Sequence, residues 1–172
     1  VVGVARRSEK IEEISKKLGG NKDKLYAIKA DFSKEEDILR TFKWTSENVG
    51  PVSILVNNAA VYFHSYLYNG KTEEWKASYD LNVIGLSIAT REALRIMRQN
   101  NIDGHIININ SVVGHKVVLG VNMYSEQSEE LKKLREFLLE SEDCADAVAY
   151  VLSTPPHVQI QELTIKPLGE FF

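Results

Sequence analysis

Cysteine is almost absent from this sequence: Cys144 is the only one among 172 residues. A single cysteine cannot form a disulfide within the chain, so a disulfide-stapled fold is excluded and a reducing, cytoplasmic compartment is expected. Long hydrophobic runs are also missing, and none approaches the roughly 20 residues that span a bilayer. The net charge of −3 offers no basic field, which argues against nucleic acid and anionic membranes as partners.

Several catalytic motifs are missing as well. The four histidines have no metal-ligand spacing, and the lone cysteine adds no second ligand, so no metal site is expected. No G-x-S-x-G turn of a serine hydrolase surrounds Ser111, which lies in the sequence N-S-V. The ten glycines nowhere reproduce the G-x-G-x-x-G fingerprint that cradles a dinucleotide pyrophosphate.

What the sequence does contain is a regular alternation of strand and helix patterns. Hydrophobic residues make up 44% of the chain and charged residues 26%, which are ordinary values for a globular protein. β-branched apolar runs predict strands at Val1–Ala5, Leu25–Ala30, Ser53–Val56 and His105–Ile109, with helical patterns between them. Such alternation is typical of an α/β doubly wound parallel sheet, and the length suits one domain, residues 1–172.

Three local signals refine this prediction. Ser33, followed by Glu36 three positions later, is a capping-box pattern that predicts a helix start. The stretch Tyr79–Met97 is apolar on most sides, as expected of one long helix packed on a sheet. Val158–Ile165 is expected to form the last strand.

The stretch from Gly104 to Tyr124 holds the residues with the clearest chemistry. His105–Ile109 has the pattern of a buried strand in a parallel sheet, and Ser111 follows it, at the edge where ligands of open α/β sheets bind. Tyr124 comes thirteen residues after Ser111, beyond a loop, so its phenol and the serine hydroxyl can converge on one substrate oxygen. A surface serine and a half-buried tyrosine are the alternative.

Asparagine-containing motifs precede this stretch. Asn57-Asn58-Ala59-Ala60 ends one predicted strand, and Asn82 lies in L-N-V. Together with I-N-I-N-S-V-V-G and M-Y-S, they resemble in order and spacing the motifs of the classical short-chain dehydrogenases/reductases, and most of all the farnesol dehydrogenase-like, NADP-dependent branch. The resemblance covers nearly the whole chain and implies a Rossmann-like fold.

The resemblance implies a catalytic role for three residues. Tyr124 would donate or accept the proton, Ser111 would hydrogen-bond the substrate oxygen, and Asn82 would support a proton-relay water. The family also has a lysine four residues after the tyrosine, which lowers the tyrosine pKa from about 10, but this sequence has Ser128 there. Together with the missing glycine fingerprint, this substitution predicts that the chain as written is not an active oxidoreductase.

The resemblance also implies NADP(H), rather than NAD(H), as the cofactor. Arg6 and Arg7 follow the strand whose end carries a 2′-phosphate-binding arginine in the family. A surface pair in front of a helix is the alternative. The other expected cofactor-binding residues are Asp31 and Phe32 beside the adenine, Asn58 and Ala59 in the cofactor groove, and Tyr124.

Part of the family's sheet has no counterpart in the sequence. In the family the strand order is 3-2-1-4-5-6-7, and Val1–Ala5 matches strand 2. The expected fold is thus an incomplete Rossmann-like sheet, without the first strand–helix unit and without an internal segment after Tyr124, as in a truncated or mis-spliced form. Val1–Ala5 and Ser53–Val56, which match the family's strands 2 and 4, would then pair directly or leave unpaired edges.

Two functions are compatible with these features. The first is an oxidoreductase that interconverts a lipophilic alcohol, of the farnesol, retinol or steroid class, and its carbonyl, with Tyr62–Leu67 and Val118–Met123 lining the substrate pocket. The second is a catalytically inactive binding or interaction protein of the same family. A homodimer or homotetramer is common in the family and compatible with this chain.

Overall fold

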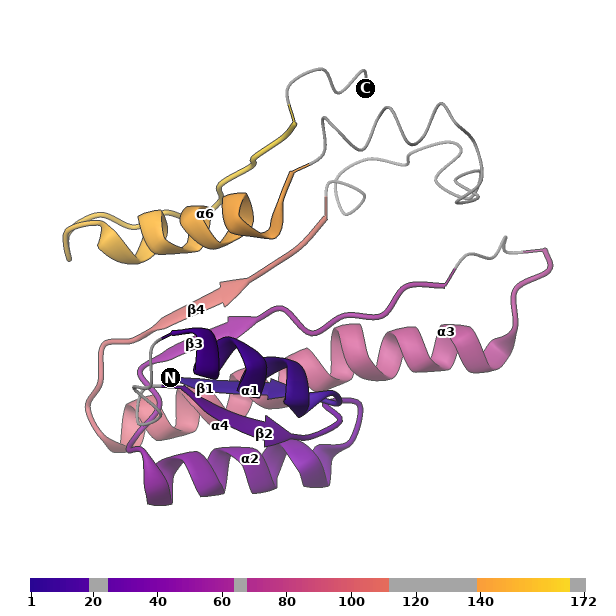
Figure 1. Ribbon diagram of the computed structural model, residues 1–172, viewed down its shortest axis with the longest axis horizontal. Coiled ribbons are helices and arrows are strands. Elements are labelled where there is room, and N and C mark those ends of the chain that lie inside the picture. Colours follow the sequence, from indigo (N-terminus) through magenta and orange to yellow (C-terminus); the bar gives the residue numbers. More distant parts are fainter. Residues whose placement is uncertain (19–24, 64–67, 112–138, 168–172) are drawn as a thin grey trace. The chain divides into compact units, whose positions relative to one another are not determined.

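The computed structural model describes residues 1–18, 25–63, 68–111 and 139–167. The chain divides into two compact units, Val1–Ile109 and Asn110–Phe172, and one domain over residues 1–172 stays a prediction. In the first unit the described elements are β1 (Val2–Ala5), α1 (Ser8–Lys17), β2 (Tyr26–Lys29), α2 (Glu35–Asn48), β3 (Ile54–Asn57), α3 (Thr72–Tyr79), η1 (Asp80–Gly85), α4 (Leu86–Gln99) and β4 (His105–Asn108). Figure 1 shows this alternation of strands and helices, which confirms the predicted α/β class.

The described strands pair in two separate parallel sheets. β1 pairs with β2, with Val2 opposite Tyr26, and β3 pairs with β4, with Ile54 opposite His105. The parallel pairing confirms the predicted strand direction. No ladder joins β1 to β3 in the described part of the chain. The sequence left two alternatives for β1 and β3, direct pairing or unpaired edges. In the described part of the chain, their facing edges are unpaired.

None of these described strands contains a buried residue, which corrects the prediction for His105–Ile109. The residues of β4 are half-buried or exposed, and Ile54 and Val56 of β3 are 45% and 41% exposed. A strand is fully buried only when neighbouring strands and helices cover it on all sides, and each described strand has one neighbour. The apolar runs therefore predict the strands correctly but not their burial.

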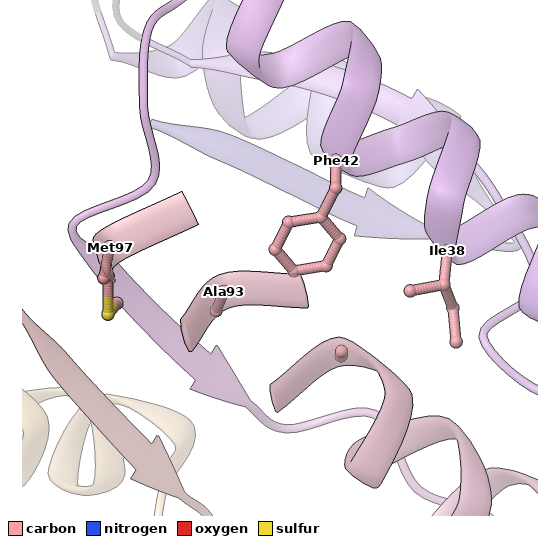
Figure 2. Close-up of a cluster of buried hydrophobic side chains, with 5 residues drawn as sticks. Ile38, Phe42, Ala93 and Met97 are labelled. Atoms are coloured by element: carbon pink, nitrogen blue, oxygen red, sulfur yellow. The ribbon is translucent and has the colours of Figure 1, made fainter. Parts of the chain in front are cut away.

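The hydrophobic core of the first unit lies between α2 and α4. Its buried members are Ile38 and Phe42 of α2 and Ala89, Ala93 and Met97 of α4. Figure 2 shows Phe42 directed toward Ala93, whose small side chain leaves room for the ring between the two helices. Leu55 of β3 and Ile106 of β4 pack against this cluster. The core thus joins α2 and α4 to the β3–β4 sheet.

The start of α2 differs from the predicted capping box at Ser33. α2 begins at Glu35, Lys34 is its N-cap residue, and no side chain caps it. The Ser33 hydroxyl and N–H instead donate to Asp31 Oδ1, at 2.8 and 3.1 Å. Local hydrogen bonds of serine and aspartate side chains compete with helix capping. Here Ser33 bonds to Asp31 within the turn before the helix and does not cap the helix.

The predicted helix Tyr79–Met97 is interrupted near its start. The π-helical turn η1 separates α3 from α4. In a π-helical turn each hydrogen bond spans one residue more than in an α-helix, so the following side chains shift around the helix axis. Such turns are frequent at functional sites, and η1 contains Asn82.

The second unit contributes a described helix, α6 (Ser141–Ser153), which starts with a capping box between Glu140 and Asp143. The predicted strand Val158–Ile165 is wrong, because this stretch is irregular. A strand needs a partner for its backbone groups, and no described strand pairs with it. Among the described ranges, no helix has the length and apolar character needed to cross a membrane.

Candidate functional site

The ends of β1 and β2 carry the first group of predicted site residues. Because the two strands are parallel, their carboxyl ends lie at the same edge of the sheet, where ligands of open α/β sheets bind. A cavity of about 300 Å³ lies there. Its lining residues come from the two strand ends and from α2: Arg6, Lys29, Ala30, Asp31, Asp37 and Arg40.

Asp31 provides an ionised carboxylate at this cavity. Its Oδ1 accepts the two bonds from Ser33 described above, and the hydroxyl bond is the main cause that holds the pKa of Asp31 below its usual 3.8. Partial burial opposes this effect. The Ser33 N–H and the positive charges of Arg6 and Lys34 lower the pKa further. Asp31 therefore offers an acceptor to ligand N–H or O–H groups at neutral pH.

Of the two predicted arginines, Arg6 lines the cavity, whereas Arg7 is not among the lining residues. Arg6 is exposed and forms no ion pair with any residue that the structure describes. Arg7 is the N-cap residue of α1. A guanidinium that forms no ion pair with the described residues, beside a cavity, suits an anionic ligand group. Arg6 is thus the arginine in place to bind such a group.

Two further residues at the cavity, Asp37 and Arg40, are not among the predicted ones. Asp37 Oδ2 accepts the Asp31 N–H at 2.7 Å, and Asp37 Oδ1 pairs with Arg40 Nη1 at 2.9 Å. Asp37 thus ties the first turns of α2 to the end of β2. The only sequence signal for the pair is its i, i+3 spacing on a helix, which is also common on solvated helix faces.

Phe32 follows Asp31 in the chain, and its side chain packs against the α2–α4 core. It is half-buried. This packing anchors the turn that carries the Asp31 carboxylate. The predicted position of Phe32 beside the adenine stays a prediction.

The ends of β3 and β4 form a second group of site residues. Asn57 Nδ2 donates to Asn108 Oδ1 at 2.9 Å and to Thr90 Oγ1 at 3.1 Å. These bonds tie both strand ends to α4. Asn58 and Ala59, the residues predicted to line the cofactor groove, follow directly and are exposed. They are accessible to a ligand, and their contact with a cofactor stays a prediction.

Asn82 lies in η1 and holds the segment that follows β3. Its Oδ1 accepts the Val61 N–H at 2.9 Å, and its Nδ2 donates to the Val61 carbonyl at 2.8 Å. Both polar ends of the Asn82 amide are therefore engaged with the backbone of one residue. These contacts are those of a positioning residue, and the predicted role of Asn82 in a proton relay stays a prediction.

Ser111 belongs to the second unit. It is exposed, and its N–H donates to Asn110 Oδ1 at 2.8 Å. Tyr124 and Ser128 lie outside the described residues, as does most of the predicted lining of the substrate pocket. The convergence of Ser111 and Tyr124 on one substrate oxygen stays a prediction.

Comparison with known proteins assigns the family. The sequence profile described as short chain dehydrogenase matches residues 1–126, which include both groups of strand ends. The chain belongs to the short-chain dehydrogenase family. This result confirms the resemblance carried by the asparagine, serine and tyrosine motifs, and it places the chain in a family of oxidoreductases.

Curated relatives of this short-chain dehydrogenase match nearly all of it. The chain is 37% identical to farnesol dehydrogenase of Aedes aegypti, over 100% of this chain and 87% of the relative. It is 34% identical to dehydrogenase/reductase SDR family member 11 of Bos taurus, over 97% of this chain and 86% of the relative. The first of these agrees with the branch that the motifs indicate.

Solved structures share the fold of this short-chain dehydrogenase. Serine dehydrogenase from Escherichia coli superposes with a TM-score of 0.80 at 27% identity, covering 100% of this chain and 88% of that one. A metagenomic short-chain oxidoreductase in complex with NADP gives a TM-score of 0.79 at 25% identity, covering 98% of this chain and 85% of that one. These likenesses confirm the predicted Rossmann-like α/β fold.

Proposed function

We propose that this chain is an NADP(H)-dependent oxidoreductase that acts between a lipophilic alcohol and its carbonyl. The observation that carries the proposal is a pair of opposite charges at one sheet edge. The Arg6 guanidinium, which pairs with none of the described residues, and the ionised Asp31 carboxylate line the same cavity. The nicotinamide of a bound cofactor supplies the hydride chemistry, and the residues of the chain bind and orient the reactants.

The cavity at the ends of β1 and β2 suits the adenosine end of NADP(H). Arg6 supplies planar donors for a 2′-phosphate. Asp31 supplies an acceptor for an exocyclic amino group. A carboxylate in the position of Arg6 would instead favour the ribose diol of NAD, so the charge at this position supports NADP(H). The NADP complex of the similar metagenomic oxidoreductase supports the same assignment.

At the substrate end, the motifs support proton transfer by Tyr124 and binding of the substrate oxygen by Ser111. Ser128 takes the place of the lysine that lowers the tyrosine pKa in the family. A phenol that titrates near about 10 is a weak base at neutral pH. Slow turnover is therefore expected of the 172-residue chain.

The same substitution supports a second function, that of a catalytically inactive binding or interaction protein. Such a protein would bind NADP(H) through Arg6 and Asp31 but would not move the proton efficiently, because Ser128 carries no positive charge to act on the Tyr124 phenol. The two functions share the cofactor site and differ in turnover.

A shortened form of the family domain is part of the proposal. The family match ends at residue 126, and the alignment with farnesol dehydrogenase runs over 213 residues, against 172 residues here. Both observations support the proposal that an internal segment is missing after Tyr124, as in a mis-spliced form.

The proposed substrate class rests on the relatives. The relative named farnesol dehydrogenase supports a lipophilic alcohol as the substrate, and the proposed range is the farnesol, retinol or steroid class. A homodimer or homotetramer, as is common in the family, and a cytoplasmic location belong to the same proposal. The lone free thiol of Cys144 supports the location.

The full chain and its Tyr124→Phe and Arg6→Ala variants test these functions. Calorimetry measures the binding of NADP⁺ and NAD⁺, and absorbance of the reduced nicotinamide follows turnover with farnesol as the alcohol. Turnover that Tyr124→Phe abolishes, with NADP⁺ binding retained, supports the oxidoreductase. Binding of NADP⁺ without turnover above the Tyr124→Phe background supports the binding protein. Equal affinity for NADP⁺ and NAD⁺ contradicts the cofactor assignment.

A further inference from the structure

We infer that Arg40 on α2 is a second guanidinium for the 2′-phosphate of the cofactor and adds to the preference for NADP(H) over NAD(H). The inference rests on the proposed NADP(H) site and contributes a residue to it from another element. Arg6 comes from the end of β1, whereas Arg40 lies in the second turn of the helix that follows β2. Both residues line the same cavity.

The side chain of Arg40 is restrained at the cavity by two contacts. Its Nη1 pairs with Asp37 Oδ1 at 2.9 Å, and its Nη2 donates to the Lys29 carbonyl at 3.4 Å. Asp37 is itself fixed, because its Oδ2 accepts the Asp31 N–H at 2.7 Å. A side chain that is already restrained loses less conformational entropy when a ligand binds. Arg40 is thus preorganised.

Arg40 also keeps donors for a ligand. A guanidinium carries several N–H groups, and the contacts of Arg40 with described residues engage one N–H on each terminal nitrogen. The side chain is 60% exposed, so the remaining N–H groups are accessible. Phosphate oxygens accept paired guanidinium donors in a bidentate geometry.

The charges around the cavity favour an anion. Arg6, Lys29 and Arg40 are cationic, and Asp31 and Asp37 are anionic. Both oxygens of Asp37 are already engaged by contacts within the protein, one with the Asp31 N–H and one with Arg40. The lining as a whole is positive, which favours a phosphate monoester over an uncharged ribose hydroxyl.

A purely structural role for Arg40 is the alternative. In that case Arg40 only ties α2 to the end of β2. Loss of a structural tie would weaken the binding of every adenosine ligand. Loss of a phosphate-binding group would weaken only the ligands that carry a 2′-phosphate. Selectivity between two matched ligands therefore separates the two roles.

The experiment measures the binding of adenosine 2′,5′-bisphosphate and of adenosine 5′-monophosphate to the full chain by calorimetry. Arg40→Ala should lower the affinity for the bisphosphate roughly tenfold, the equivalent of one charge-assisted hydrogen bond, and leave the monophosphate affinity unchanged. Arg40→Lys should restore part of the loss, since it keeps the charge. Lys43→Ala, a neighbouring α2 residue that is 75% exposed and pairs with Glu47, should change neither affinity.

The remaining outcomes separate this inference from the proposed function. An unchanged bisphosphate affinity in Arg40→Ala, or an equal loss for both ligands, overturns the role of Arg40. If Arg6→Ala abolishes the preference for the bisphosphate in that same series, the proposed NADP(H) site stands without Arg40. A wild-type chain that binds both ligands equally overturns the 2′-phosphate assignment, and the role of Arg40 with it.

Discussion

Gly85 lies against the backbone carbonyl of Phe32 so closely that a Cβ atom at position 85 would overlap the Phe32 oxygen. Gly85 is buried and ends the π-helical turn η1. Phe32 belongs to the turn that carries Asp31. This approach joins the turn beside the predicted adenine site to the helical turn that carries Asn82, and glycine is the residue that permits it.

Gly85→Ala is expected to lower the free energy of unfolding by roughly 1–3 kcal/mol, because the added methyl group meets backbone and not a movable side chain. Urea unfolding measures this loss. Gly3→Ala is the control: its Cβ would contact Ile11 Cγ2 at 2.9 Å, and the Ile11 side chain can rotate away, so its loss should be smaller. Equal losses in the two variants would contradict the close approach at Phe32.

Asn82→Ala is expected to release the backbone of Val61. The variant removes both bonds of the Asn82 amide, and because these bonds are exposed, the cost to stability should be about 1 kcal/mol. The direct measurement is hydrogen exchange of the Val61 amide, which should become faster. Asn100→Ala, which removes a side-chain bond to the Ile96 carbonyl, is the matched control and should leave Val61 unchanged. Unaltered exchange in Asn82→Ala would show that other contacts hold this segment.

The cavity at the ends of β1 and β2 can be predicted from the sequence because it depends on strand ends. Apolar runs locate β1 and β2 to within a residue or two, and parallel strands place their carboxyl ends at one edge. Arg6 follows the end of β1 directly, and Asp31 follows the end of β2 after one residue, so their proximity requires no knowledge of side-chain packing.

Other features depend on contacts that no local pattern contains. The π-helical turn around Asn82 lies within an apolar stretch whose periodicity gives no sign of an interruption. The bond from Asp37 to the Asp31 N–H depends on how α2 packs beside β2. Val158–Ile165 has the composition of a strand, but a strand forms only with a partner, and the pattern of one segment does not contain its partner.

The pH dependence of the free energy of unfolding should report the ionisation of the Asp31 carboxyl group. Its pKa is lowered in the folded chain, so the ionised form is the one that folding favours. This contribution is complete above the usual value of 3.8 and is lost as the pH falls through the lower folded value. Ser33→Ala removes the largest cause of the shift, so the folded pKa should rise toward the usual value.

Nuclear magnetic resonance titration of the Asp31 carboxyl carbon measures this change. Ser153→Ala, which removes a hydroxyl bond to the Tyr150 carbonyl in α6, is the control and should leave the Asp31 titration unchanged. A titration of Asp31 at or above 3.8 in the unaltered chain would show that the Ser33 bonds do not favour the carboxylate.

Glu92 is the buried charge of α4, and it lies between two arginines. Its Oε1 pairs with Arg91 Nε at 2.9 Å and its Oε2 with Arg95 Nη2 at 3.0 Å. Arg91 also reaches Glu35 of α2 at 2.8 Å, and this bond, followed by the one to Glu92, raises the pKa of Arg91 above its usual value. The network links the two helices that form the core.

Glu92 is far more buried than its two arginine partners. Removing the carboxylate and removing the arginines should therefore change the free energy of unfolding by different amounts. The Glu92 side chain is 5% exposed, whereas those of Arg91 and Arg95 are 54% and 65% exposed. Glu92→Met replaces the buried carboxylate with an apolar group of similar size and leaves the arginines in contact with water, so stability should change by less than about 1 kcal/mol. The double variant Arg91→Ala/Arg95→Ala leaves the carboxylate buried without its partners and should be clearly less stable. Urea unfolding of both variants, with Lys43→Ala as a control on exposed α2 charge, gives the comparison. A loss for Glu92→Met as large as that of the double variant would contradict the expected cost of burying the Glu92 carboxylate without its partners.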